Sequence, residues 1–160
     1  MTTDLSGPSR RKHFTLVATA AAVFAIDLAT KIAASAALAD RDIDLPGPLD
    51  LRLSHNPGVA FGMGTDTPTW LVLTLTGAVA AGIAVAAWRG LFASSIAAGV
   101  VVGGALANVA DRSQAGTVVD MLYTGWCPTF NVADIAIVCG AFALAATAWR
   151  APPDEPATVP

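Results

Sequence analysis

Charged residues are scarce in this sequence of 160 residues. Only 13% are Asp, Glu, Lys or Arg, against roughly 25% in an ordinary soluble domain. Hydrophobic residues make up 54% of the chain, and the mean hydropathy is +0.60. A soluble domain is therefore not expected, and most of the chain is predicted to lie in lipid.

Residues that bind metal ions or nucleic acids are also few. The chain has two cysteines, Cys127 and Cys139, and two histidines, His13 and His55, without any spacing typical of a zinc site. We expect no metal and no cofactor, with Cys139 as a small apolar residue inside a helix and Cys127 as a free thiol in a loop. The net charge is -3, and no basic cluster could neutralise a row of phosphates, so nucleic acid is not an expected partner.

The motifs of two large protease classes are missing. The sequence has no Gly-x-Ser-x-Gly elbow and no His-Glu-x-x-His helix. His55 directly follows Ser54, and adjacent side chains in a strand point to opposite faces. If the chain is hydrolytic, carboxylate chemistry remains, in which two aspartates share one proton and activate a water molecule.

Four long apolar runs dominate the chain, at residues 14–39, 70–88, 91–109 and 132–149. Each can span roughly 30 Å of hydrocarbon as a helix. Unbroken apolar blocks favour helices over a barrel, so we predict an all-α membrane protein, a bundle of four transmembrane helices. Residues 14–150 form its single domain, between a tail at 1–13 and a Pro-rich tail at 151–160. Gly99, Gly103 and Gly104 predict close helix contacts in the third span.

The basic residues suggest how the chain is oriented. One side of the predicted membrane carries Arg10, Arg11, Lys12, Arg89 and Arg150, and the other carries Arg41, Arg52 and Arg112. Because basic residues are retained in the cytoplasm, both termini are expected there, and the connections at 40–69 and 111–131 are expected outside. In the first outer loop, Leu49, Leu51 and Leu53 alternate with polar residues, which predicts a short half-buried strand.

The N-terminal run has a second interpretation, as a cleavable secretory signal. Residues 10–12 are basic, and Ala37-Leu38-Ala39 resembles a cleavage site. However, the apolar run is longer than the usual stretch of about 7 to 15 residues, and Asp27 and Lys31 interrupt it. We therefore expect an uncleaved helix.

Ionisable residues inside a span need a partner or a function. Asp27 and Lys31 are spaced i, i+4, so they share a helix face and predict a structural ion pair. Lys31 lies in the outer half of the first span, from which its ammonium is expected to extend toward the outer surface.

A second polar group gathers at the predicted outer boundary. Asn108, Asp111 and Arg112 share one face at the end of the third span. Asn131 and Asp134 begin the fourth, where an N-cap and a first-turn acid are an adequate structural explanation of each residue alone. Caps do not explain why Asp120 and Asn56 are expected at the same boundary of a chain so poor in polar groups. Their convergence suggests a site.

Five motifs in order carry a family resemblance. They are Asp27-Leu-Ala-Thr-Lys31, Asn56-Pro-Gly-Val-Ala-Phe-Gly62, Gly103-Gly-Ala-Leu-Ala-Asn-Val-Ala-Asp-Arg112, Val118-Val-Asp120 and Phe130-Asn-Val-Ala-Asp134. Together they resemble the bacterial lipoprotein signal peptidases, also called signal peptidase II. One departure is Ala107, where that family usually has Gly.

The resemblance implies an aspartic endopeptidase that cuts prolipoproteins just before a cysteine carrying diacylglycerol. Asp120 and Asp134 match the catalytic pair. Asn56, Asn108, Arg112 and Asn131 match residues that support the pair and hold substrate, and Asp27, Lys31 and Asp111 match positions that look structural. The first outer loop is expected to form a small extracytoplasmic β element, and Gly58 and Gly62 are expected to let it close as a flap.

The resemblance also implies a setting for the enzyme. It predicts a bacterial plasma (inner) membrane with the site at the outer face, prolipoproteins and membrane phospholipids as partners, and no required oligomer. Two other classes remain open, a small proton-coupled transporter and a structural membrane subunit. The charged positions gather toward one face of the predicted membrane, so no proton relay is expected to cross it.

Overall fold

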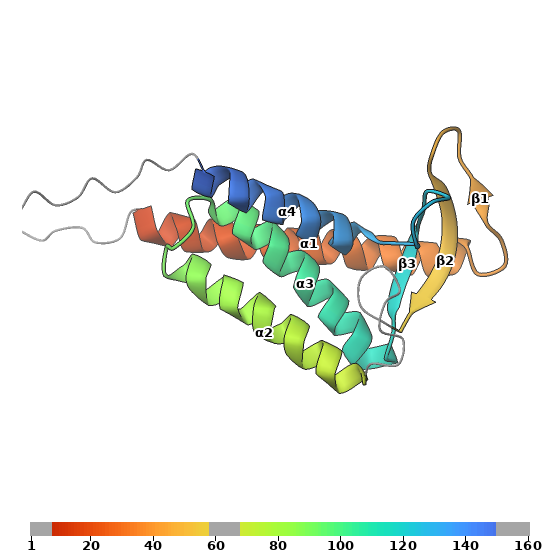
Figure 1. The fold of residues 1–160 in the computed structure, drawn as a ribbon, viewed down its shortest axis with the longest axis horizontal. Coiled ribbons are helices and arrows are strands. Elements are labelled where there is room, and N and C mark those ends of the chain that lie inside the picture. Colours follow the sequence, from red (N-terminus) through yellow and green to blue (C-terminus); the bar gives the residue numbers. More distant parts are fainter. Residues whose placement is uncertain (1–7, 58–67, 150–160) are drawn as a thin grey trace, which may run out of the picture.

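The computed structural model describes residues 8–57 and 68–149. The elements are α1 (Pro8–Ala37), β1 (Ile43–Asp44), β2 (Asp50–Asn56), α2 (Thr69–Trp88), α3 (Ser95–Ala115), β3 (Val118–Tyr123) and α4 (Val132–Trp149). The helices form an elongated bundle with the sheet at one end, whereas the start of α1 and the end of α4 lie at the other end (Figure 1). The expectation of a mostly helical protein with a small β element is confirmed.

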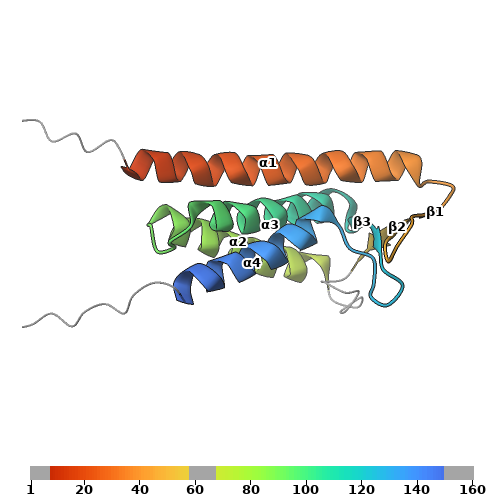
Figure 2. The same ribbon diagram turned by 90° about the horizontal axis from the view of Figure 1, so that it is seen from above.

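Helix α3 is the centre of the bundle and packs against α1, α2 and α4 (Figure 2). Glycines allow this approach. A Cβ atom on Gly103 would lie 2.5 Å from the carbonyl oxygen of Ala20 in α1, and one on Gly104 would lie 2.7 Å from the carbonyl oxygen of Ala133 in α4. The close helix contacts predicted from these glycines are therefore present.

The outer surfaces of the helices are apolar. Among the described residues, three helices, namely α2, α4 and the Ser9–Ala37 part of α1, are long and apolar enough to cross a membrane. Large side chains on them are exposed, including Phe14, Ile32 and Phe142, which is 73% exposed. Such a continuous apolar surface is stable in lipid and not in water.

The third helix does not match the predicted span at 91–109. It begins later because Ser94 is its N-cap, with Oγ accepting from the backbone N–H of Ala97 at 3.1 Å. It continues to Ala115 and ends at Gly116, whose φ of 73° closes the last turn. The polar residues after position 109 remain helical because they have partners inside the protein, which hydropathy cannot show.

Helix α1 also differs from the predicted span at 14–39. It starts at Pro8, so residues 8–13 of the predicted N-terminal tail are helical; proline is compatible with a first helical turn. There His13 stacks on Trp88 with ring centroids 3.9 Å apart, and its Nε2 lies 2.9 Å from the Trp88 carbonyl oxygen. This contact joins the start of α1 to the end of α2.

The sheet is antiparallel with the order β1-β2-β3. Leu51 and Leu53 of β2 pack on a buried cluster of Ala34, Leu38 and Met121, which joins the sheet to the end of α1. The strand predicted from leucine alternation is thus confirmed. Strand β3, from the second connection, was not predicted, although it carries Asp120.

Candidate active site

Strand β3 places Asp120 against the helical bundle. Alternate residues of a strand face opposite sides; Val118 and Asp120 line a cavity in the bundle, whereas Met121 belongs to the cluster beneath the sheet. Asp120 is 1% exposed. Its neighbour across the sheet is Ser54. Two residues further along β2, Asn56 pairs with Val118, and the Asn56 side chain is close enough to hydrogen-bond to the Asp120 carboxylate.

The first turn of α4 places Asp134. Asn131 precedes this helix, and its Oδ1 accepts from the Asp134 backbone N–H at 2.9 Å. In return, the Asn131 backbone N–H donates to Asp134 Oδ2 at 3.2 Å. This reciprocal pair has the form of a capping box. The N-cap and the first-turn acid considered from sequence are therefore both present.

Asn131 also reaches the second aspartate. Its Nδ2 donates to Asp120 Oδ1 at 2.7 Å, and its side chain is fully buried. One residue thus contacts the carboxylates of both Asp120 and Asp134. Capping of α4 explains the contacts between Asn131 and Asp134. It does not explain the hydrogen bond from Asn131 to Asp120, which is not needed to stabilise the helix.

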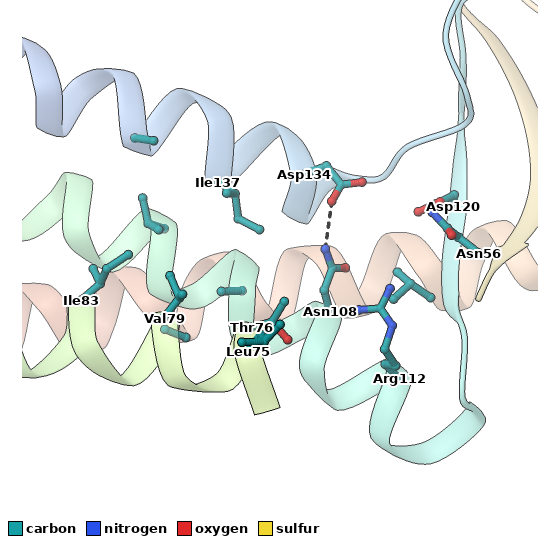
Figure 3. A pocket seen from close by; sticks show the side chains of 15 residues that line it. Asn56, Leu75, Thr76, Val79, Ile83, Asn108, Arg112, Asp120, Asp134 and Ile137 are labelled. Carbon is teal, nitrogen blue, oxygen red and sulfur yellow. Dashed lines mark hydrogen bonds between the residues drawn. The ribbon is translucent and has the colours of Figure 1, made fainter. Parts of the chain in front are cut away.

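Helix α3 contributes Asn108 and Arg112 to the same place. Asn108 Nδ2 donates to Asp134 Oδ1 at 2.9 Å. Figure 3 shows the two carboxylates pointing toward one another, with the Arg112 guanidinium below them. Arg112 is buried, and the charges of Asp120 and Asp134 both act on it. Two neighbouring acids are thus combined with one cation and three amides, those of Asn56, Asn108 and Asn131.

The environment of Asp120 favours its protonated form. Burial and, to a smaller extent, the negative charge of Asp134 raise the pKa of Asp120 to about 6, although hydrogen bonds from Asn131 and Asn56 act in the opposite direction. A buried carboxyl group beside a second carboxylate is expected to behave in this way. Close to neutral pH, such a group can both release and accept a proton.

The predicted pair of Asp27 and Lys31 is present, with Lys31 Nζ 2.6 Å from Asp27 Oδ2. Lys31 Nζ also lies 2.9 Å from Asp111 Oδ2 and donates to Asn108 Oδ1 at 2.9 Å. The expectation that Lys31 extends toward the outer surface is wrong. Its side chain is 3% exposed because all three partners lie inside the bundle.

A cavity of about 470 Å³ begins at the two aspartates and continues between α2, α3 and α4. Its polar end is formed by Asn56, Asn108, Arg112, Asp120 and Asp134, and its remaining wall is mostly apolar, including Leu75, Val79, Ile83, Val101, Ile137 and Ala141. This size lies within the range of about 300–1,000 Å³ that is usual for ligand sites. The cavity therefore presents carboxylate chemistry at one end of an apolar channel.

Sequence reasoning missed the contribution of α2 to this cavity. Leu75, Val79 and Ile83 recur every four residues along one helix face. Because nearly every residue of α2 is apolar, this face has no polar contrast to mark it. Gly58 and Gly62, the expected flap residues, lie outside the described residues.

The remaining candidate ligands do not join the site. Within residues 8–57 and 68–149, no group of three or more His, Cys, Asp or Glu side chains is placed to hold a metal ion. Cys127 is a free thiol with its Sγ 3.0 Å from the Thr124 hydroxyl. Cys139 is also free and lies on the exposed surface of α4.

Comparison with known proteins gives a consistent assignment. The family model described as signal peptidase (SPase) II matches residues 19–150. A lipoprotein signal peptidase of Rhodococcus jostii is 40% identical over 146 residues, which cover 85% of this chain and 73% of that protein. A lipoprotein signal peptidase of Rhizorhabdus wittichii is 39% identical over 137 residues, which cover 78% of this chain and 80% of that protein.

The fold has a counterpart among solved structures. A bacterial membrane enzyme determined by the in meso method at 2.3 Å resolution superposes with a TM-score of 0.75, covering 91% of this chain and 94% of that one, at 22% identity. That likeness concerns the fold alone, whereas the family model and the relatives extend over most of the sequence. The chain belongs to the signal peptidase II family of aspartic proteases.

Proposed function

We propose that this chain removes the signal peptide from diacylglyceryl-modified prolipoproteins, with Asp120 and Asp134 as its catalytic pair. Lipoprotein signal peptidases are aspartic enzymes that act on prolipoproteins. The observation that carries the proposal is the pair of carboxylates joined through Asn131 at the polar end of the cavity.

The reaction requires one proton on the pair. The ionised carboxylate takes a proton from a water molecule, and the protonated one donates its proton to the oxygen of the scissile carbonyl as the water attacks the carbon. Collapse of the resulting tetrahedral intermediate returns a proton to the carboxylate pair and delivers one to the departing amine. Because the two groups titrate as a unit, the shared proton belongs to the pair.

The polar residues around the pair suggest distinct supporting roles. Asn108 and Asn131 donate to the carboxylates, which keeps their unprotonated oxygens directed at the water. Arg112 and Asn56 line the cavity beside them. From there the Arg112 fork can reach a substrate carbonyl and a carboxylate together, and the Asn56 amide can hold the substrate backbone.

The position of α3 supports a proposal for how the chain sits in the membrane. Helices α2 and α4 flank α3, and the cavity lies between them. We propose that α3 is a fourth span whose polar end is tolerated because its neighbours cover it, and that the cavity opens sideways to lipid at the outer face. A substrate whose acyl chains stay in the bilayer could then reach the aspartates.

The proposal is tested by incubating the purified protein with a diacylglyceryl-modified prolipoprotein and following the mobility shift on cleavage. The same prolipoprotein without the lipid is the control substrate. Asp134→Asn should lower cleavage by roughly 10²–10⁴-fold. Adding Asp120→Asn should cost little more, because residues that act as a unit are strongly non-additive.

Retained cleavage in a well-folded Asp134→Asn protein would exclude the aspartic mechanism. The transporter and structural-subunit alternatives would then return. Neither has support from a specific feature of the fold: among the described residues, the buried charged side chains are Asp27, Lys31, Arg112 and Asp120. Lys31 pairs with Asp27 and Asp111, and Arg112 and Asp120 line the cavity.

A further inference from the structure

Lys31 is at the centre of a buried cluster that the proposed reaction does not itself use. An ammonium group has three N–H donors and no acceptor. Lys31 Nζ has three oxygen partners within 3 Å, one each from Asp27, Asp111 and Asn108. Its charge is therefore compensated inside the protein by Asp27 of α1 and Asp111 of α3, and it donates a hydrogen bond to Asn108 of α3.

The two acids held by Lys31 each bind the backbone beside a catalytic aspartate. Asp27 Oδ1 accepts from the backbone N–H of Ala133 at 2.8 Å, and Ala133 directly precedes Asp134. Asp111 Oδ2 accepts from the backbone N–H of Val119 at 3.3 Å, and Val119 directly precedes Asp120. The start of α4 and the start of β3 are thus both connected to the same ammonium group.

The third partner of Lys31 sets the direction of an amide. Asn108 Oδ1 accepts from Lys31, so Asn108 Nδ2 is turned toward Asp134 Oδ1. The opposite orientation would direct an NH₂ group at the ammonium group and a carbonyl oxygen at the carboxylate, with no hydrogen bond at either contact. Lys31, together with Asn131 Nδ2, which donates to the same oxygen at 3.2 Å, therefore sets which end of Asn108 faces the reacting carboxylate.

We propose that Lys31 is a positioning residue that fixes the placement of both aspartates relative to each other, through Asp27, Asp111 and Asn108. This inference rests on the proposed function of Asp120 and Asp134. It goes further than a structural ion pair, because a pair that only packs α1 needs no bond to the backbone at Ala133 and Val119.

Removing Lys31 should affect the chemical step and not substrate binding. Lys31 is absent from the residues that line the cavity, so KM should stay within about twofold. Loss of alignment should lower kcat by about tenfold or more.

The charge of Lys31 adds a second readout. The charged groups that face this region are Asp27 of α1, Asp111 and Arg112 of α3, Asp120 of β3 and Asp134 of α4. Burial raises the pKa of Asp120, and the charge of Lys31 acts in the opposite direction. Without Lys31, the pH profile of kcat should therefore move to higher pH.

The experiment measures kcat, KM and the pH profile for Lys31→Met with a diacylglyceryl-modified prolipoprotein in detergent. Since Asp27 would lose its countercharge and destabilise the fold, the double variant Lys31→Met/Asp27→Asn is measured in parallel. The matched control is Gly99→Ala. Its added Cβ would lie 2.7 Å from the Leu16 carbonyl oxygen, so it disturbs the contact between α1 and α3 far from the cluster.

Both Lys31 variants should lose kcat and keep KM, and Lys31→Met should also show the shifted profile, whereas Gly99→Ala should lower the thermal midpoint without moving the profile. A folded Lys31 variant with the parent kcat and profile would overturn the inference. So would a loss of activity that matches Gly99→Ala at equal thermal stability with no shift in profile. Asp120→Asn, measured alongside, separates the two proposals: if it remains active, the catalytic pair itself is wrong.

Discussion

Replacement of Asp120 by Asn should make the protein more stable while removing its activity. The Asn side chain has nearly the same shape and can still accept from Asn131, but it cannot ionise. Burial and the charge of Asp134 raise the pKa of Asp120 to about 6 from an ordinary value of 3.8. The folded protein therefore binds a proton at this position more tightly than the unfolded chain does.

The sign and size of the effect follow from this difference in pKa. Because its pKa is higher in the folded protein, Asp120 contributes to the free energy of unfolding when it is protonated. This contribution is fully present below pH 3.8 and is lost as the pH rises through about 6. A shift of about two units corresponds to about 3 kcal/mol at pH 7. The Asn variant has no buried carboxyl group to ionise at pH 7 and avoids this loss of about 3 kcal/mol. Since 1 kcal/mol shifts the thermal unfolding midpoint by about 2–4 °C in a protein of this size, its midpoint at pH 7 should be roughly 6–12 °C higher than that of the parent.

The assay is thermal unfolding in one detergent at a fixed scan rate, at pH 7 and near pH 4, together with cleavage of a lipidated prolipoprotein. The difference in midpoint should nearly vanish near pH 4. Asp40→Asn, which changes an exposed aspartate just after α1, is the control and should alter neither quantity. Equal midpoints for parent and Asp120→Asn at pH 7 would refute the reasoning about burial, and full activity would refute the catalytic role.

Two further predictions concern the cation of the site and the orientation of the chain. Arg112→Lys keeps the charge but loses the planar fork, so turnover should fall by about tenfold or more; a variant as active as the parent would show that only the charge of Arg112 matters. A reporter enzyme that works only outside the cytoplasm, fused after Arg150, should be inactive, since both termini are expected inside. Activity of that fusion would reverse the proposed topology.

Much of the fold could be predicted from hydropathy alone. The bounds of α4, Val132–Trp149, match the prediction, and those of α2 match within one residue, because a long unbroken apolar segment in lipid satisfies its backbone hydrogen bonds as a helix. The alternation around Leu51 identified β2 for a similarly local reason. Each of these signals is contained in a short segment and needs no tertiary partner.

Errors occurred where the partner of a residue is remote in sequence. The end of α3 was placed too early because Asp111 and Arg112 look like interfacial residues, whereas both are enclosed by other elements. Strand β3 was not predicted because its stability comes from pairing with β2 and from packing on α1. Lys31 was expected to extend toward the outer surface because the sequence shows its spacing to Asp27 but not its contact with Asn108, which is 77 positions away.

The sequence by itself determined the chemical composition of the site and its surroundings. It predicted long apolar helices and carboxylate chemistry, and it contained a few acids and amides that needed an explanation, with Asp120 and Asp134 among them. Periodicity can place these side chains on a face or at a boundary, since that depends only on local geometry.

Only the tertiary structure decided how these residues meet. It joined Asp120 and Asp134 through Asn131, and it placed Lys31 where its two acids hold the backbone next to each of them. Those contacts span up to 106 positions in the chain. They exist because α3 packs closely on α1 and α4 through glycines while β3 folds back over the end of the bundle, and no local pattern encodes a distance between segments so far apart.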